Sequence, residues 1–266
     1  MNAAACACLG FLGLACSAGA LAQAISAGST SPDQLEGAPV STAPMSAMQM
    51  SAMQMNDAAL YGALMIDQLE LRDADRGASA AWQAEGWYGG DYDKLWVRTE
   101  GEEGATPAES ADLELLWDRV ISSWWSVQAG GREDFGTGPS RSWAAAGVRG
   151  LAPYDIAVEA TGYVGDDGRT AARLRIESEL LITERVVLQA ELEANAYGES
   201  DGERRLGRGL ADVDAGLRWR YDLRRDLGPY LGVAFTGLCG ATAERARAAH
   251  EPTRALQVVA GVRALL

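Results

Sequence analysis

Residues 188–196 read Leu188-Gln189-Ala190-Glu191-Leu192-Glu193-Ala194-Asn195-Ala196, so apolar and polar side chains alternate almost without exception. Successive side chains of a β-strand point to opposite faces, and this stretch therefore predicts a strand with one apolar and one polar face. Residues 173–180 and 212–221 alternate in the same way. Each stretch alone also fits a strand of a soluble sandwich, so the fold has to be decided from the whole set.

About twelve such runs follow one another, and most have about 9–12 residues, which is the length of a membrane-spanning strand rather than of an average soluble strand of about 5–6. They lie near residues 61–72, 79–89, 94–102, 111–120, 126–135, 143–151, 155–164, 171–181, 185–197, 209–221, 229–238 and 256–266. The first run alternates poorly around Asp67, so a periplasmic helix or plug is the alternative there, and ten strands are possible.

The connections between the runs alternate in length. Short ones lie at 90–93, 122–123, 152–154, 183–184 and 224–225, and longer ones at 101–110, 136–142, 165–170, 198–209 and 239–255. Outer-membrane barrels have short periplasmic turns, longer outer loops and an even number of strands. We therefore predict an all-β fold, a transmembrane antiparallel up-and-down β-barrel over residues 61–266. Both ends of the barrel are expected on the periplasmic side of the outer membrane.

Two segments of different character precede the barrel. Residues 1–22 carry no charged side chain and end in Ala20-Leu21-Ala22, which predicts a cleaved signal peptide. A membrane anchor is the alternative, although the segment is barely long enough to span a bilayer. Residues 23–60 are dominated by Ser, Ala, Pro, Gly and Gln, which cannot bury enough apolar surface to offset the entropy of ordering. We expect this segment to be a flexible periplasmic arm.

The arm contains the unit Ser-Ala-Met-Gln-Met twice in tandem, at 46–50 and 51–55. Thioether sulfur is a soft ligand that selects Cu(I), or Ag(I), over hard cations. The alternatives are simple low complexity and a packed apolar stripe, and the spacing of two and three residues fits one face of a helix poorly. The candidate metal ligands are Met45, Met48, Met50, Met53 and Met55.

Composition excludes several functions. The formal net charge of −14 argues against nucleic acid as a partner. His250 is the single histidine, which disfavours Ser-His-Asp and Cys-His hydrolases and sites with several His ligands. An outer-membrane lipid hydrolase or acyltransferase would need a nucleophile beside a base, and we predict no enzyme.

In a barrel, the charged faces of the strands line the lumen. Opposite charges then meet, which predicts an ion-paired interior, with a polar path for cations as the functional alternative. The predicted lumen residues are Arg173, Arg175, Glu177, Glu179, Glu191, Glu193, Asp212, Asp214, Arg218 and Arg220. A second group of side chains predicts an aromatic girdle at the membrane interface. Its members are Trp82, Trp87, Tyr88, Tyr92, Trp96, Trp117, Trp124, Trp125 and Trp219.

Five stretches carry a family resemblance. They are Trp82-Gln-Ala-Glu-Gly-Trp-Tyr-Gly-Gly-Asp-Tyr-Asp-Lys-Leu-Trp-Val-Arg-Thr-Glu-Gly-Glu102, Gly138-Pro-Ser-Arg-Ser-Trp143, Gly150-Leu-Ala-Pro-Tyr154, Gly165-Asp-Asp-Gly-Arg-Thr-Ala-Ala-Arg173 and Gly209-Leu-Ala-Asp-Val-Asp-Ala-Gly-Leu-Arg218. With the Met-rich arm, they make the chain resemble the copper-resistance protein B family of bacterial outer membranes. The resemblance implies a barrel whose periplasmic arm binds copper and contributes to copper tolerance.

Arms of that family often mix His and Asp with Met, whereas this arm has no His, which favours Cu(I) over Cu(II). We therefore expect an outer-membrane protein that binds Cu(I) through its arm and sequesters or exports copper. Its expected partners are copper ions, outer-membrane lipid and, by the resemblance, a periplasmic multicopper oxidase or copper carrier. The alternative is a general porin or solute channel without metal specificity.

Overall fold

The computed structural model describes residues 59–74, 77–104, 110–136 and 138–266. This part of the chain forms twelve strands and one helix. They are β1 (Tyr61–Ala74), β2 (Gly77–Gly89), β3 (Asp93–Gly104), β4 (Ser110–Val120), β5 (Trp125–Gly136), β6 (Arg141–Ala152), β7 (Ile156–Gly165), β8 (Thr170–Leu181), β9 (Val186–Tyr197), β10 (Gly209–Tyr221), β11 (Leu227–Leu238), α2 (Gly240–Ala248) and β12 (Arg254–Leu265).

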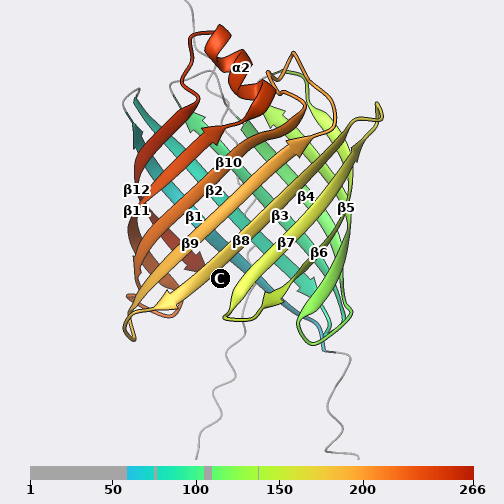
Figure 1. Ribbon diagram of the computed structural model, residues 1–266. Coiled ribbons are helices and arrows are strands. Elements are labelled where there is room, and N and C mark those ends of the chain that lie inside the picture. The colour runs from blue at the N-terminus through green and yellow to red at the C-terminus, as the bar shows by residue number, and fades with distance from the viewer. Residues whose placement is uncertain (1–58, 75–76, 105–109, 137) are drawn as a thin grey trace, which may run out of the picture. The chain divides into compact units, whose positions relative to one another are not determined.

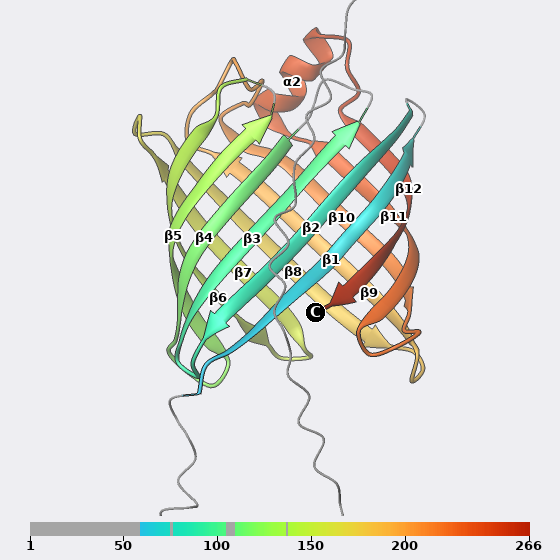
Figure 2. The same cartoon turned by 180° about the vertical axis from the view of Figure 1, so that it is seen from behind.

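Each strand pairs antiparallel with its neighbours in sequence, and β1 pairs with β12 to close the sheet into a barrel (Figures 1 and 2). Closure leaves no strand edge, so the backbone N–H and C=O groups of the wall pair within the sheet, as hydrocarbon surroundings require. The predicted up-and-down antiparallel barrel is confirmed, with twelve strands rather than ten. No helix in the described segments is long and apolar enough to cross a membrane.

The two edges of the barrel differ. The short turns lie at one edge, together with the start of β1 and the end of β12, and we call this the inner edge (Figure 1). The two longest connections, β9–β10 and β11–β12 with α2, lie at the opposite edge, which we call the outer edge. The predicted sorting by length holds only in part, because the outer links β5–β6 and β7–β8 have four residues each, whereas the inner turns have three to five.

Strand β1 contains a β-bulge in place of the helix or plug that its weak alternation allowed. Its register with β2 runs from Ile66 opposite Ala84 to Gln68 opposite Gln83, so Asp67 is an extra residue. Asp67 forms an ion pair with Arg263 at 3.3 Å, and Gln68 donates to Glu191 at 2.7 Å. Both side chains therefore lie inside, and the bulge explains why the alternation breaks at this point.

The barrel is apolar outside and charged inside. Its outer wall exposes many large apolar side chains, such as Leu115, Leu231 and Val258. The four largest side chains that are almost fully buried include Arg98 and Glu114. The buried side chains of this barrel are therefore those enclosed in the lumen. The exposed apolar wall suits contact with lipid.

The aromatic girdle is only partly as predicted. Most exposed aromatic side chains lie toward the inner edge, whereas Phe135 and Phe235 lie toward the outer edge. Those of the inner edge are Tyr61, Tyr88, Tyr92, Trp117, Trp124, Trp125, Tyr154, Trp219 and Tyr221. The prediction was wrong for Trp87 and Trp96, which are cross-strand partners with ring centroids 6.4 Å apart on the lumen face. Trp96 lies two residues before Arg98 on β3, so both side chains point to the lumen. The guanidinium carbon of Arg149 lies 4.2 Å from the Trp96 ring centroid.

The predicted signal peptide (1–22) and all but the last two residues of the predicted arm (23–60) lie outside the described residues. The five candidate ligands Met45, Met48, Met50, Met53 and Met55 lie there as well. The structure thus tests the barrel, and the metal site in the arm stays a prediction.

Candidate functional site in the barrel lumen

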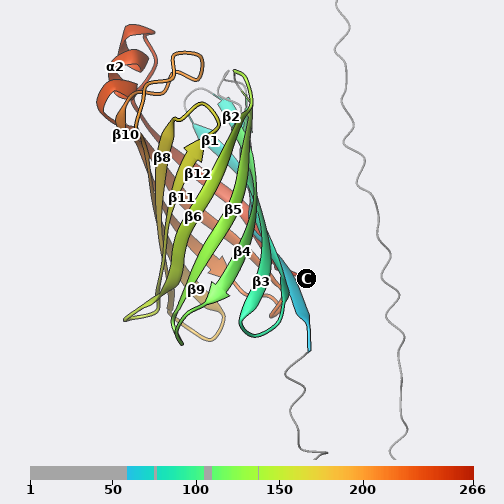
Figure 3. The same ribbon diagram turned by 90° about the vertical axis from the view of Figure 1, so that its right-hand side faces the viewer.

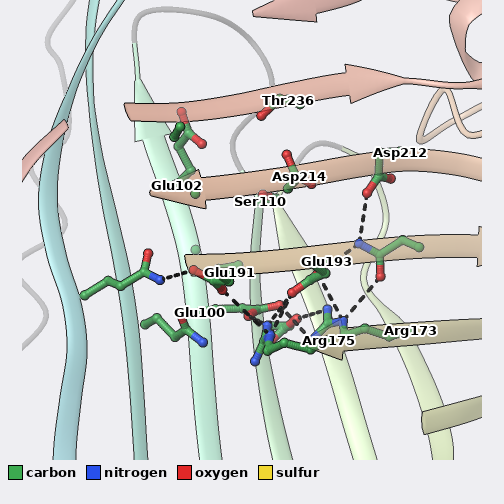
Figure 4. A pocket seen from close by; sticks show the side chains of 18 of the residues that line it. Glu100, Glu102, Ser110, Arg173, Arg175, Glu191, Glu193, Asp212, Asp214 and Thr236 are labelled. Carbon is green, nitrogen blue, oxygen red and sulfur yellow. Dashed lines mark hydrogen bonds and ion pairs between the residues drawn. The ribbon is translucent and has the colours of Figure 1, made fainter. Parts of the chain in front are cut away.

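The charged faces of β8, β9 and β10 line the lumen, as predicted. Arg173 and Arg175 of β8 and Glu191 and Glu193 of β9 surround a cavity together with Asp212 and Asp214 of β10 (Figure 4). Glu179 of β8 pairs with Arg220 of β10 at 2.9 Å, nearer the inner edge. The ion-paired interior is therefore confirmed, and its partners extend well beyond neighbouring strands.

Arg98 of β3 and Arg175 of β8 bridge strands that are far apart around the barrel. Arg98 Nη1 contacts Glu159 of β7 at 2.6 Å and Glu114 of the adjacent β4 at 2.9 Å. Arg175 Nη2 contacts Glu193 of the adjacent β9 at 2.6 Å and reaches Glu100 of β3, five strands away. The barrel is narrower in Figure 3 than in Figure 1, which allows side chains of opposite walls to meet.

Arg218 of β10 makes a further crossing, as Arg173 of β8 also does through Glu100 and Asp112. Its guanidinium donates to Glu70 at 3.1 Å and to Gln68 at 2.8 Å, both on β1, and to Glu191 at 2.8 Å. A Cβ on Gly216 would collide with Arg218 Nη1, so glycine at this position gives the guanidinium its space. We call Arg98, Arg175 and Arg218 the arginine belt.

The belt is closed to solvent. The side chains of Arg98 and Arg218 are 2% and 3% exposed, and those of Glu114 and Glu70 are 0% exposed. Buried charges are tolerated when they are paired and hydrogen-bonded, and each belt arginine meets at least two carboxylates. The belt thus fills the middle of the lumen with matched charge.

A cavity of about 480 Å³ lies on the outer side of the belt, and we call it the outer vestibule (Figure 4). Its floor includes Gln68, Arg175 and Arg218, and its rim includes Leu206 and Leu238 near the outer edge. Lumen residues of the inner half, such as Trp96, Arg149 and Glu177, do not line it. This cavity therefore occupies the outer half of the lumen and ends at the belt.

Four lumen carboxylates form no ion pair within the described ranges: Asp118, Glu177, Asp212 and Asp214. Asp118 accepts hydrogen bonds from Ser126 at 2.7 Å and Gln128 at 3.0 Å. Asp212 accepts a hydrogen bond from Asn195 at 2.9 Å. Asp214 lies directly opposite Glu193, and Glu177 lies directly opposite Glu191. Like charges at directly opposed positions destabilise a sheet, so each pair needs a positive charge or a proton to offset the repulsion.

The described residues offer few ligands that suit Cu(I). Met65, near the inner edge, lies 3.2 Å from Arg263 Nη2 through its sulfur. Cys239 caps the N-terminus of α2 and His250 follows its C-terminus, which places them about 16 Å apart along the helix. No three His, Cys, Asp or Glu side chains of the described segments are grouped to hold a metal ion. The lumen suits hydrated cations better than a chelated soft metal.

The wall of the lumen that faces β8–β10 was not predicted from the sequence. Its missed members are Gln68, Glu70, Glu85, Arg98, Glu100, Asp112, Glu114 and Glu159. The signal was present, because charged residues occupy every second position at Arg98-Thr99-Glu100-Gly101-Glu102 and at Asp112-Leu113-Glu114. Their partners were not visible, because ion pairs between opposite walls depend on the cross-section of the barrel.

The fold resembles solved porin structures. A NanC porin is 12% identical, with a TM-score of 0.51, and the match covers 76% of this chain and 98% of that chain. A KdgM porin is 11% identical with a TM-score of 0.47 over 76% of this chain and 98% of that one. The likeness to the NanC porin concerns the fold, a closed β-barrel.

The family follows from sequence. Residues 60–266 match the family described as copper resistance protein B precursor (CopB). Copper resistance protein B of Escherichia coli is 39% identical over 207 residues, covering 78% of this chain and 70% of that protein. A copper resistance protein B homolog of Pseudomonas syringae pv. tomato is 42% identical over the same shares of the two chains. The chain belongs to the copper resistance protein B family of outer-membrane proteins.

Proposed function

We propose that this protein binds Cu(I) through the five methionines of its N-terminal arm and confers copper tolerance by sequestering or exporting the ion. The barrel anchors the arm at the periplasmic face of the outer membrane. A periplasmic copper oxidase or carrier is the partner that such an arm would serve. Membership of the copper resistance protein B family is the observation that carries the proposal.

The distribution of soft ligands supports the arm as the binding site. Five of the seven methionines lie between Met45 and Met55, whereas Met65 is the one methionine of the described residues. The lumen presents mainly carboxylate oxygens, which suit hard cations. Cu(I) therefore has its preferred ligands in the arm and not in the barrel.

A Cu(I) competition titration tests the proposal on the refolded mature protein. The test variant changes Met45, Met48, Met50, Met53 and Met55 to Ser, and the matched control changes Met65→Ser in the barrel. We expect tight binding in the wild type and in the control, and loss of that binding in the five-residue variant. His250→Ala is a second control, because His250 lies at the outer edge and the expected change in binding is none.

The outcomes separate the alternatives. Equal binding by the wild type and the five-residue variant would place the site in the barrel. Absence of binding in both would contradict capture of Cu(I) by the arm and favour a general channel. Loss of binding in Met65→Ser alone would assign the site to the inner edge of β1.

A further inference from the structure

We propose that the lumen is a cation-selective path, which the arginine belt holds closed in this structure. The proposal concerns the barrel alone, so it is independent of copper binding by the arm. It rests on the placement of carboxylates on both sides of the belt, on the outer vestibule and on the way in which the belt crosses the lumen.

Carboxylates follow one wall of the lumen from edge to edge. Asp212 and Asp214 lie on the outer side, Glu193 and Glu191 lie at the belt, and Glu177 with Glu179 lies on the inner side. Residues two apart on a strand share a face, and the register places Asp214 opposite Glu193 and Glu191 opposite Glu177. The row is therefore continuous across β8, β9 and β10.

A second observation points to a ligand in the outer vestibule. Asp112 of β4 is 5% exposed, and its Oδ1 has no hydrogen-bond partner in the described part of the chain, although its Oδ2 pairs with Arg132 at 2.8 Å and Arg173 at 3.0 Å. Asp112 lines the same cavity as Asp212 and Asp214. A buried carboxylate oxygen without a donor is costly, and a cation or its hydration water would satisfy it.

The charges of the belt explain both closure and selectivity. Arg175 and Arg218 each pair with a carboxylate of the row, Glu193 and Glu191, so their guanidinium groups act as internal counter-ions for the row. Arg98 instead pairs with Glu159 and Glu114, which lie outside the row. When an arginine moves away from the row, the carboxylates that paired with it lose their counter-charge and become available to cations in the lumen. Rings of Asp and Glu select cations in channels, and a narrow lumen in a low-dielectric wall strengthens this effect.

The ligand class follows from the ligand atoms. Carboxylate oxygens that are not grouped into a three-ligand metal site suit a cation that keeps part of its hydration shell. We therefore assign the path to hydrated mono- and divalent cations. Cu(I), which prefers thioethers, would gain little from these oxygens.

Conductance of the full-length protein in planar bilayers tests the proposal. Wild type is expected to conduct rarely, whereas Arg175→Ala/Arg218→Ala removes two crossings and raises the conductance roughly tenfold, the effect of lowering a barrier by about 1.4 kcal/mol. A second variant also carries Glu100→Ala and Glu70→Ala, which removes one carboxylate partner of Arg175 and one of Arg218. Fewer buried carboxylates are then left without a counter-charge. The control is Arg205→Ala, which breaks an ion pair with Glu251 in the outer loops. The slower migration of boiled samples on gels verifies that each barrel has folded.

Reversal potentials in a KCl gradient then test selectivity. The opened variants are expected to prefer K⁺ over Cl⁻, and adding Asp212→Asn/Asp214→Asn to them is expected to reduce that preference several-fold. Opened variants that fold but conduct no more than the wild type would overturn the belt as the closing element. A wild type that conducts steadily, or opened variants that prefer Cl⁻, would overturn the proposal as well.

Discussion

At the scale of single residues, the lumen shows how a charge is tolerated away from water. Arg98 is almost fully buried between Glu114, Glu159 and Glu85, and its ion pair with Glu159 is formed through both ends of the guanidinium fork. Removing one member of a buried pair leaves the other without a counter-charge, which is more costly than the pair itself is stabilising.

Arg98→Met is therefore expected to lower the free energy of unfolding by about 3–5 kcal/mol. The matched control is Arg119→Met, because Arg119 is 57% exposed and lies 3.9 Å from Asp93, and we expect about 0–1 kcal/mol there. Urea titration of the barrel in vesicles, followed by tryptophan fluorescence, measures both. Equal losses in the two variants would mean that the belt contributes no more than a surface ion pair.

Residue by residue, the sequence predicts which face a side chain occupies wherever the alternation is regular. It predicted the lumen side of Arg173, Glu193 and Arg218 correctly. It failed for Trp87 and Trp96, because an aromatic residue was assigned to the interface by type although the parity of β3 places it with Arg98 inside. Parity is the stronger criterion, since one step along a strand reverses the face.

At the scale of elements, the bulge in β1 is a device that brings one more acidic group into the lumen. Ile66 and Leu64 lie on the outer face, and both Asp67 and Gln68 lie inside. Without the bulge, regular alternation from Leu64 would place the side chains of Gln68 and Glu70 on the lipid-facing side of the wall. The bulge therefore keeps the partners of Arg218 in the lumen.

Two single deletions in β1 test this interpretation. Deleting Asp67 restores a regular strand with every other side chain on its present face, so we expect a folded barrel that has lost one ion pair with Arg263. Deleting Ile66 instead moves Asp67 to the lipid face, where a charge is costly, although less so than the about 2–4 kcal/mol of a lipid-facing Arg or Lys. Urea midpoints should fall more for the second deletion, and the reverse order would contradict the assigned register.

The loop between β9 and β10 is organised by Asp201. Its carboxylate accepts from Arg169 at 2.5 Å and Arg141 at 3.1 Å, and from the backbone N–H groups of Glu203 and Arg204. Burial alone would raise the pKa of Asp201, but the backbone N–H of Arg204 and the Arg141 guanidinium outweigh burial and lower that pKa below its usual range.

Because the folded-state pKa is lowered, the stabilisation by Asp201 is complete above the unfolded value of about 4 and is lost as the pH falls through the lower folded value. We expect trypsin to cleave this loop slowly at pH 7, and Asp201→Asn to raise the cleavage rate there. In the wild type, the loop is expected to open only below about pH 4. Cleavage by pepsin, which is active in acid, follows this opening. Opening at pH 5–6 would contradict the role of Asp201.

Elements were predictable to different degrees for a physical reason. Each strand carries its own period-two signal, so all twelve were located within a few residues. Helix α2 was missed within the predicted loop 239–255, although Ala241-Thr-Ala-Glu-Arg-Ala-Arg-Ala248 is rich in helix formers. Its buried side, with Thr242 and Ala246, packs near β10, and this contact is tertiary rather than local.

At the scale of the whole molecule, closure of the barrel brings together residues that are remote in sequence. Arg175 and Glu100 are 75 positions apart, and Arg218 and Glu70 are 148 apart. Adjacent-strand pairing could be predicted from the order of the strands. Pairs across the lumen could not, because they depend on which walls approach each other when twelve strands close.

The barrel and the arm are expected to act as separable parts, since the family match begins at residue 60 and all pairs that close the barrel lie beyond it. Deleting residues 23–55 while keeping the signal peptide should leave a barrel that folds and reaches the outer membrane, with heat-dependent gel migration unchanged. Cu(I) binding should be lost, and cells that carry the deletion should tolerate no more copper than cells without the protein. Full tolerance with the deletion would show that the barrel handles copper by itself. In that case, Arg175→Ala/Arg218→Ala in the shortened chain would reveal whether the lumen is the route, because opening the belt should then change tolerance as well as conductance.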